Sequence, residues 1–109
     1  MTKSEYIAKL KKAIDDSIEL RWEKLKEDRD ANVPYCFLCT LTKKSLLNYG
    51  YCSWCPINDV YSDECCKEWD KWYVNKTPEN AQAVIDRLKA IDVDGWAEKL
   101  VKRGVIEDD

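Results

Sequence analysis

The chain has 109 residues and a formal net charge of −3, and charged residues make up 36% of it. This length is typical of one domain, here residues 1–109, with a small hydrophobic core, and the composition suits a helical protein. The N-terminus shows no apolar signal-peptide core, and no apolar run is long enough to cross a membrane. We therefore expect a cytoplasmic protein without a membrane partner.

The excess of acidic side chains lies in residues 77–109 and includes the tail Glu107-Asp108-Asp109. Nucleic-acid binding requires concentrated positive charge that displaces counterions from phosphates. No basic patch of that kind is evident, because acidic neighbours dilute the few clustered lysines. Nucleic acid is therefore not the expected main partner, although a nucleic-acid or nucleotide-binding protein remains an alternative.

Residues 1–30 predict one long N-terminal helix. Ser4 is a candidate N-cap, and Glu5 lies in the first turn. Up to Asp28, apolar residues recur three or four positions apart, at Ile7, Leu10, Ile14, Ile18, Trp22 and Leu25. Such a helix either braces the whole domain or shares part of its apolar stripe with a second copy, so a homo-oligomer formed through this helix is an alternative.

Residues 34–57 contain two Cys-x-x-Cys pairs, Cys36 with Cys39 and Cys52 with Cys55. Each pair directs two thiolates from one tight turn, and two such turns complete a tetrahedral sulfur site for structural zinc. Cysteine must supply every ligand, because the chain has no histidine. Cys65 is an alternative ligand in place of one of the four. An iron–sulfur cluster and a set of disulfides are the competing interpretations of these cysteines.

Residues 62–75 predict a second helix, from about Asp63 to Val74, with Ser62 as its N-cap. One side of it carries Cys65, Cys66, Trp69, Trp72 and Tyr73. Whether these aromatic residues belong to the core or to an interface stays open. Cys66 is interpreted as a buried small hydrophobe rather than a metal ligand.

Residues 77–104 predict two further helices. Thr77 followed by Pro78 is a helix start, and apolar spacing continues to about Ile91. Asp94 is the candidate cap of a last short helix that stops at Gly104. Residues 105–109 form an acidic tail that we expect to be loose. The predicted fold is therefore a mainly α-helical domain built around a four-cysteine zinc knuckle, with at most two or three very short strands.

No catalytic site is predicted. The chain has no histidine, no recognisable nucleophile motif and no glycine-rich phosphate loop, so we expect a protein that is not an enzyme. Aromatic residues crowd the middle third, where they either cover the metal site or form a binding face. Tyr51 and Trp54, beside the second cysteine pair, are the best candidates for contact with a protein partner.

The two cysteine pairs, Pro56, Cys65 and the later Trp69 and Trp72 resemble small cysteine-rich zinc-binding proteins of bacteriophages. The resemblance covers residues 34–91 and implies zinc and a phage source. Small phage proteins of this kind often bind and block a host protein or defence component, so the resemblance implies an inhibitor in the host cytoplasm. The expected function is a zinc-stabilised protein-binding module, with an oligomeric structural protein as a further alternative.

Overall fold

The computed structural model describes residues 1–34, 37–38, 41, 56 and 66–109. Its elements are α1 (Lys3–Ser17), the π-helical turn η1 (Ile18–Trp22), α2 (Glu23–Glu27), α4 (Lys67–Val74), α5 (Pro78–Lys89) and α6 (Val93–Lys102). Within these ranges extended pairing is limited to an isolated parallel bridge between Thr2 and Glu107. The prediction of a mainly α-helical protein is confirmed for this part of the chain.

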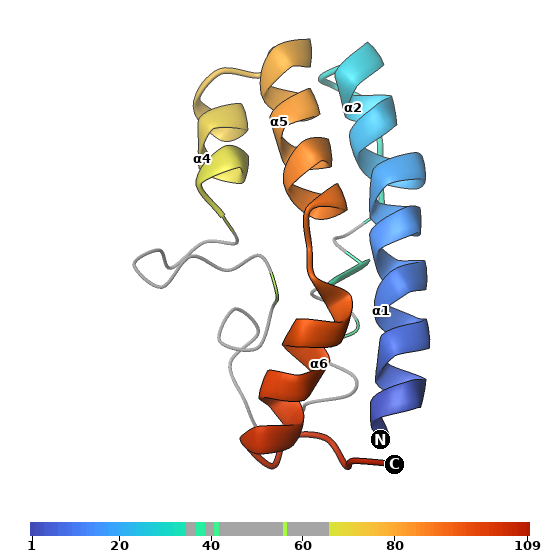
Figure 1. Cartoon of the computed structure of the whole chain (residues 1–109). Helices are drawn as coiled ribbons and strands as arrows, with labels where there is room; N and C mark the ends of the chain where they lie inside the picture. The colour runs from blue at the N-terminus through green and yellow to red at the C-terminus, as the bar shows by residue number, and fades with distance from the viewer. Residues whose placement is uncertain (35–36, 39–40, 42–55, 57–65) are drawn as a thin grey trace.

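The first three elements form one continuous rod, and α5 and α6 run end to end beside it in the opposite direction (Figure 1). α6 contacts α1, and α5 contacts both η1 and α2. α4 packs against α5. The two termini lie close together beside α6 (Figure 1).

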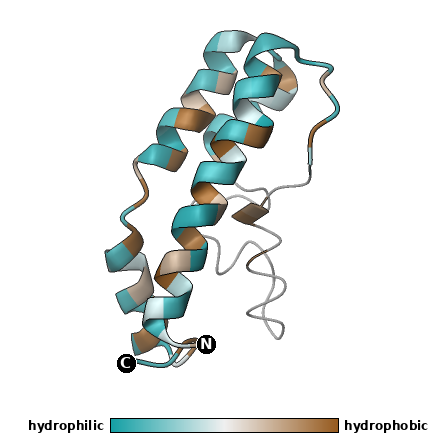
Figure 2. Cartoon of the chain, turned by 90° about the vertical axis from the view of Figure 1, so that its right-hand side faces the viewer, coloured by the Kyte–Doolittle hydropathy of each residue, from teal (hydrophilic) through white to brown (hydrophobic). Residues whose placement is uncertain are grey.

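One cluster of buried hydrophobic residues holds these helices together. Hydrophobic positions recur along each helix between hydrophilic ones, as amphipathic helices require (Figure 2). The cluster consists of Tyr6, Leu10, Ala13, Ile14, Trp22, Leu25, Leu38, Cys66, Trp72, Ala81, Val84, Ile85, Leu88, Ala97, Leu100 and Ile106. Both the N-terminal rod and the helices after residue 66 therefore contribute to the same core.

The long N-terminal helix begins at Lys3, and the predicted cap at Ser4 is wrong. Thr2 is the N-cap, because its backbone is extended and its Oγ1 accepts a hydrogen bond of 3.3 Å from the Glu5 amide. Ser4 already lies inside the first turn. The pairing of Thr2 with Glu107 fixes this earlier start.

The π-helical turn η1 changes the register of the N-terminal helix. Ser17 and Trp22 are both buried although they are five residues apart. A regular α-helix brings residues three or four apart onto one face, so this spacing needs the wider turn. The Glu23 amide closes it by donating to the Ile18 carbonyl. The turn thereby directs Trp22 into the core.

α4 begins at Lys67, later than the predicted start at Asp63. Cys66 precedes it with an extended backbone and without a side-chain capping bond, so the helix cannot continue towards the N-terminus. The predicted cap Ser62 and the predicted first turn lie outside the described residues.

α5 starts as predicted, since Thr77 Oγ1 accepts a 3.2 Å hydrogen bond from the Asn80 amide. The cap of α6 is Asp92 instead of the predicted Asp94. Asp92 Oδ1 accepts a 3.1 Å hydrogen bond from the Gly95 amide. Asp94 lies in the first turn of the helix, where its charge suits the N-terminal dipole.

α6 ends at Lys102 in a Schellman motif around Gly104, close to the predicted stop. Gly104 has φ +73°, a left-handed conformation that glycine adopts without strain. The Gly104 amide donates to the Val101 carbonyl at 3.0 Å, and the Val105 amide donates to the Leu100 carbonyl at 2.9 Å. This turn brings the following residues back over the helices.

The acidic tail is held in place, so the expectation of a loose end is wrong. Ile106 is buried in the core. The Glu107 amide donates to the Met1 carbonyl at 2.9 Å, and the Lys3 amide donates to the Glu107 carbonyl at 2.7 Å. These backbone bonds fasten the C-terminus to the start of α1.

Candidate functional site

The cysteines predicted to bind metal lie outside the described residues. This applies to Cys36, Cys39, Cys52 and Cys55 and to the alternative ligand Cys65. Among the residues that the structure does describe, no cluster of three or more cysteine, aspartate or glutamate side chains could hold a metal ion. The zinc site and its iron–sulfur alternative stay predictions, as do the partner-binding roles of Tyr51 and Trp54, which also lie outside the described ranges.

Described residues before, within and after the cysteine segment are attached to the helical core. Phe37 and Leu38, the two residues between Cys36 and Cys39, pack against it, and Leu38 is fully buried. Before them, the Pro34 carbonyl accepts a 2.6 Å hydrogen bond from Arg21 Nη1. Arg21 therefore ties the approach to the cysteine segment to the π-helical turn.

Cys66 forms the other attachment, at the start of α4. It is fully buried and belongs to the hydrophobic cluster. Its thiol is not part of a disulfide. This burial agrees with the first part of the interpretation of Cys66, a small buried residue, whereas its exclusion as a metal ligand stays a prediction.

Aromatic side chains join α4 to the π-helical turn. The Trp22 ring meets the Trp69 ring edge-on at 5.0 Å between centroids and the Trp72 ring at 5.2 Å. Tyr73 extends this set, nearly parallel to Trp69 at 6.3 Å and perpendicular to Trp72 at 5.7 Å. Edge-to-face arrangements of this kind stabilise by about 0.5–1.5 kcal/mol per pair beyond the buried area. We call Trp22, Trp69, Trp72 and Tyr73 the aromatic cluster.

Two cations flank the aromatic cluster. The Arg21 guanidinium carbon lies 4.8 Å from the centre of the Trp69 ring and 5.3 Å from that of Trp22. Lys76 Nζ lies 5.2 Å from the Trp72 ring centre. Cation–π contacts at these distances are each worth about 0.5–2 kcal/mol. The contact of Arg21 with Trp69 holds α4 against the N-terminal rod, and that of Lys76 holds the following link against α4.

The aromatic cluster is part core and part surface. Trp22 and Trp72 are buried, whereas Tyr73 is 57% exposed. Its neighbour Val74 is 89% exposed, and these two are the exposed large hydrophobic side chains of the described residues. The sequence pattern left open whether Tyr73 belongs to the core or to an interface, and it did not single out Val74 as a surface residue.

A shallow pocket of about 390 Å³ opens beside Val74. Asp70, Lys71 and Asn75 line it together with Asn80 from α5. Asn80 Nδ2 donates to the Asn75 carbonyl at 2.7 Å and thereby satisfies a backbone oxygen just beyond the end of α4. The pocket walls are thus fixed by the connection between two helices.

Two residues of this region, Val74 and Arg21, have only a weak signal in the sequence for their role. Val74 is a β-branched residue at the very end of a helix whose apolar stripe already contains Trp69 and Trp72, so it lies off that stripe. Arg21 precedes a tryptophan of the N-terminal stripe, but the partner carbonyl of Pro34 is thirteen residues away in sequence. Neither position could be recognised without the packing of α4 against η1.

None of the described helices combines the length and apolar character needed to span a lipid bilayer. No family model, curated protein or solved structure matches the chain.

Proposed function

We propose that the chain is a small protein-binding module in which the end of α4 contacts the partner and a structural zinc ion shapes the preceding cysteine segment. The observation that carries the proposal is the exposed pair Tyr73 and Val74 on a helix whose other side is anchored in the core. A large apolar pair left in water at a rigid position is typical of a contact site rather than of a core.

The anchoring of α4 supports a role in binding. Aromatic residues dominate the energetic centres of protein interfaces, and rigid ones lose little conformational entropy on association. Trp69 and Trp72 fix the helix against Trp22, so Tyr73 and Val74 are already oriented before a partner arrives. The pocket beside Val74 offers space for one apolar side chain of the partner.

The zinc part of the proposal has Cys36, Cys39, Cys52 and Cys55 as ligands, with Cys65 as an alternative. Its support is the ligand spacing in the sequence. The chain also enters the core at Leu38 and again at Cys66. Cys39, Cys52 and Cys55 lie between these two points, and Cys36 lies two residues before the first. A metal bound by them would therefore restrict a segment that is already held at both ends, at a small entropic cost.

Metal analysis combined with thiol titration tests the zinc site. We expect one zinc per chain and four thiols that become reactive only after a strong chelator removes the metal. Chelation should leave most helical circular dichroism, because the described core comes largely from the helices. Iron in place of zinc would favour the iron–sulfur cluster over the zinc site. Metal-free protein with its thiols paired in disulfides would contradict both metal assignments.

Site-specific photo-crosslinking tests the binding role. A photoreactive amino acid at Val74 should give one protein adduct from cells of the host, whereas the same group at the exposed Lys99 should not. Untagged wild-type protein should compete the adduct away. The resemblance to phage proteins directs this search to host proteins, with inhibition of the captured protein as the consequence to assay.

The variant Tyr73→Ala provides the quantitative arm of this test. It should weaken binding of the captured protein about 30-fold, since removing an interface anchor costs about 2 kcal/mol. The melting temperature should change little, because the ring is more than half exposed. Identical adducts at Val74 and Lys99, or affinity that does not depend on Tyr73, would contradict the proposal.

A further inference from the structure

One face of α1 carries an exposed stripe that continues into a residue of η1, which packs at the edge of the core. Ala8, Lys11 and Asp15 are exposed, and Ile18, the first residue of η1, is half-buried. These positions are three, four and three residues apart, so they lie on one side of the helix. The stripe combines a small residue, a base, an acid and a large aliphatic residue.

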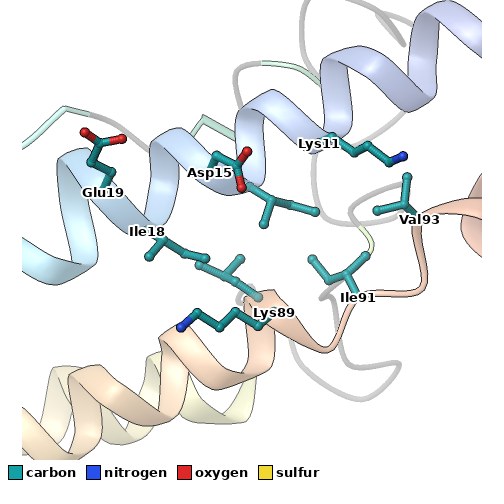
Figure 3. Close-up of a pocket in the computed structure, with 9 residues that line it drawn as sticks. Lys11, Asp15, Ile18, Glu19, Lys89, Ile91 and Val93 are labelled. Atoms are coloured by element: carbon teal, nitrogen blue, oxygen red, sulfur yellow. The ribbon is translucent and has the colours of Figure 1, made fainter.

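This stripe borders an apolar groove of about 640 Å³ between α1 and the link from α5 to α6 (Figure 3). The break between α5 and α6 leaves Ile91 and Val93 only partly covered. The aliphatic lining consists of Ile14, Ile18, Leu88, Ile91 and Val93, and the charged lining of Lys11, Asp15, Glu19 and Lys89. The groove thus carries two basic and two acidic side chains, which gives no preference for a ligand of one charge.

The charges of the stripe are not used within the described part of the chain. Lys12 and Asp16, four residues apart, form an ion pair of 3.0 Å on the same helix. Lys11 and Asp15 have the same spacing, yet no ion pair forms between them. One base and one acid, one turn apart, therefore remain available for a partner with the opposite order of charges.

We propose that this partner is a second copy of the chain, docked antiparallel along the stripe. A two-fold axis midway between Lys11 and Asp15 places each Lys11 opposite Asp15 of the other copy. The same axis places Ala8 opposite Ile18, because each lies three residues outside the charged pair. The small Ala8 then faces the large Ile18 of the other copy twice, and the second helix lies over Lys11 and Asp15 at the edge of the groove.

This self-association does not rest on the proposed function. It uses α1 and the groove beside the α5–α6 link, whereas the proposed contact site is at the end of α4. The self-complementary order of charge and size along the stripe favours a second copy over an unrelated protein or a small ligand, which would have to supply both signs at matching positions.

Sedimentation equilibrium over a wide concentration range tests the dimer. Lys11→Asp and Asp15→Lys should each weaken the dimer at least about tenfold, because each places like charges opposite one another twice. The double variant K11D/D15K should restore the affinity to within about threefold of the wild type, since the two pairs reform with reversed charges. Residues 11 and 15 are also one turn apart on the same helix, so unchanged circular dichroism of the single variants must accompany this restoration to assign it to the dimer.

Lys9→Asp is the matched control, since it makes the same charge change at an exposed position of α1 outside the stripe. It should leave the dimer constant unchanged, and all variants should keep the helical circular dichroism. A wild type that stays monomeric up to about 1 mM, a concentration at which even weak association is visible, would overturn the inference. A dimer insensitive to Lys11→Asp and Asp15→Lys, or one that the double variant does not restore, would overturn it equally.

Discussion

The two ends of the helical bundle are stabilised in different ways. At the terminal end, where α1 meets α6, polar groups are paired: Lys3 pairs with Glu98, and Trp96 Nε1 donates to Tyr6 Oη at 3.1 Å. At the aromatic end, where η1, α2, α4 and α5 meet, ring contacts dominate. The terminal end is closed by its own hydrogen bonds, whereas the aromatic end has buried polar atoms without a hydrogen-bond partner in the described part of the chain.

Three buried atoms show this difference directly. Ser17 Oγ, Arg21 Nε and Trp72 Nε1 are buried without a hydrogen-bond partner in the described part of the chain. Buried polar atoms of this kind are uncommon and are a cost that the surrounding packing must offset. They lie on η1 or on residues next to it in the bundle. Such a local cost, next to an exposed apolar pair, is expected where a fold serves binding rather than stability alone.

The largest effect should follow from removing the centre of the aromatic end. Trp22→Ala should lower the free energy of unfolding by about 3–5 kcal/mol, because a buried tryptophan in contact with two other rings leaves a cavity. The half-buried Trp96 is the matched position at the terminal end, and Trp96→Ala should cost about half as much. Urea unfolding followed by circular dichroism measures both, and equal losses would contradict the contrast between the two ends.

The next largest effect should come from Arg21, which joins the aromatic cluster to the Pro34 carbonyl. Arg21→Ala removes a hydrogen bond of a charged group and a cation–π contact, so we expect a loss of about 2 kcal/mol. The loss for Arg21→Lys should lie between zero and that of Arg21→Ala, since lysine keeps the charge but lacks the planar guanidinium. The comparison fails if lysine and alanine are equally destabilising or if neither has an effect.

The helical periodicity was sufficient to predict most of this fold. Apolar residues three or four apart located the N-terminal rod, and Thr77-Pro78 located the start of α5, because both are local signals. The caps at Thr2 and Asp92 were missed. In each case a nearby residue had an equal propensity for the N-cap position. The choice of Thr2 depends on its contact with Glu107, which is distant in sequence.

The candidate site could be predicted only in part. The aromatic residues of α4 were recognised, but their division into buried Trp72 and exposed Tyr73 depends on how the helix is rotated against η1. The π-helical turn that places Trp22 there has no recognisable pattern in the sequence. The metal prediction rests on cysteine spacing alone, since Cys36, Cys39, Cys52 and Cys55 lie outside the described residues.

A smaller effect should arise from backbone geometry at the terminal end. Gly104→Ala should cost about 1 kcal/mol, because φ of +73° is unfavourable for a residue with a Cβ atom. Gly95→Ala is the control within the same helix. Its Cβ would lie 2.3 Å from Asp92 Oδ2 and displace the cap, but alanine gains a similar amount in helix propensity, so the net change should be near zero. Thermal unfolding of both variants measures the difference, and equal melting temperatures would contradict it.

The smallest effect should come from the exposed charges at the terminal end. The hydrogen bond from Lys3, and then its positive charge, hold the pKa of Glu98 below the ordinary 4.5. The same hydrogen bond, with the nearby Asp108 and Asp109, raises the pKa of Lys3 above 10.5. A lowered carboxyl pKa stabilises the fold above the ordinary value and loses this contribution as the pH falls through the folded pKa. A raised lysine pKa stabilises below its ordinary value and loses this contribution as the pH rises through the folded pKa.

The wild type should therefore exceed Glu98→Gln in urea midpoint by a small, constant margin between about pH 6 and 9. The margin should shrink in acid, as the pH falls through the lowered pKa of Glu98, and in alkali, as the pH rises through the raised pKa of Lys3. The double variant K3M/E98Q should add little to the single change, because the two side chains act on each other. A margin that persists unchanged in acid would show that Glu98 acts through packing, and the terminal end would then resemble the aromatic end more closely than its hydrogen bonds indicate.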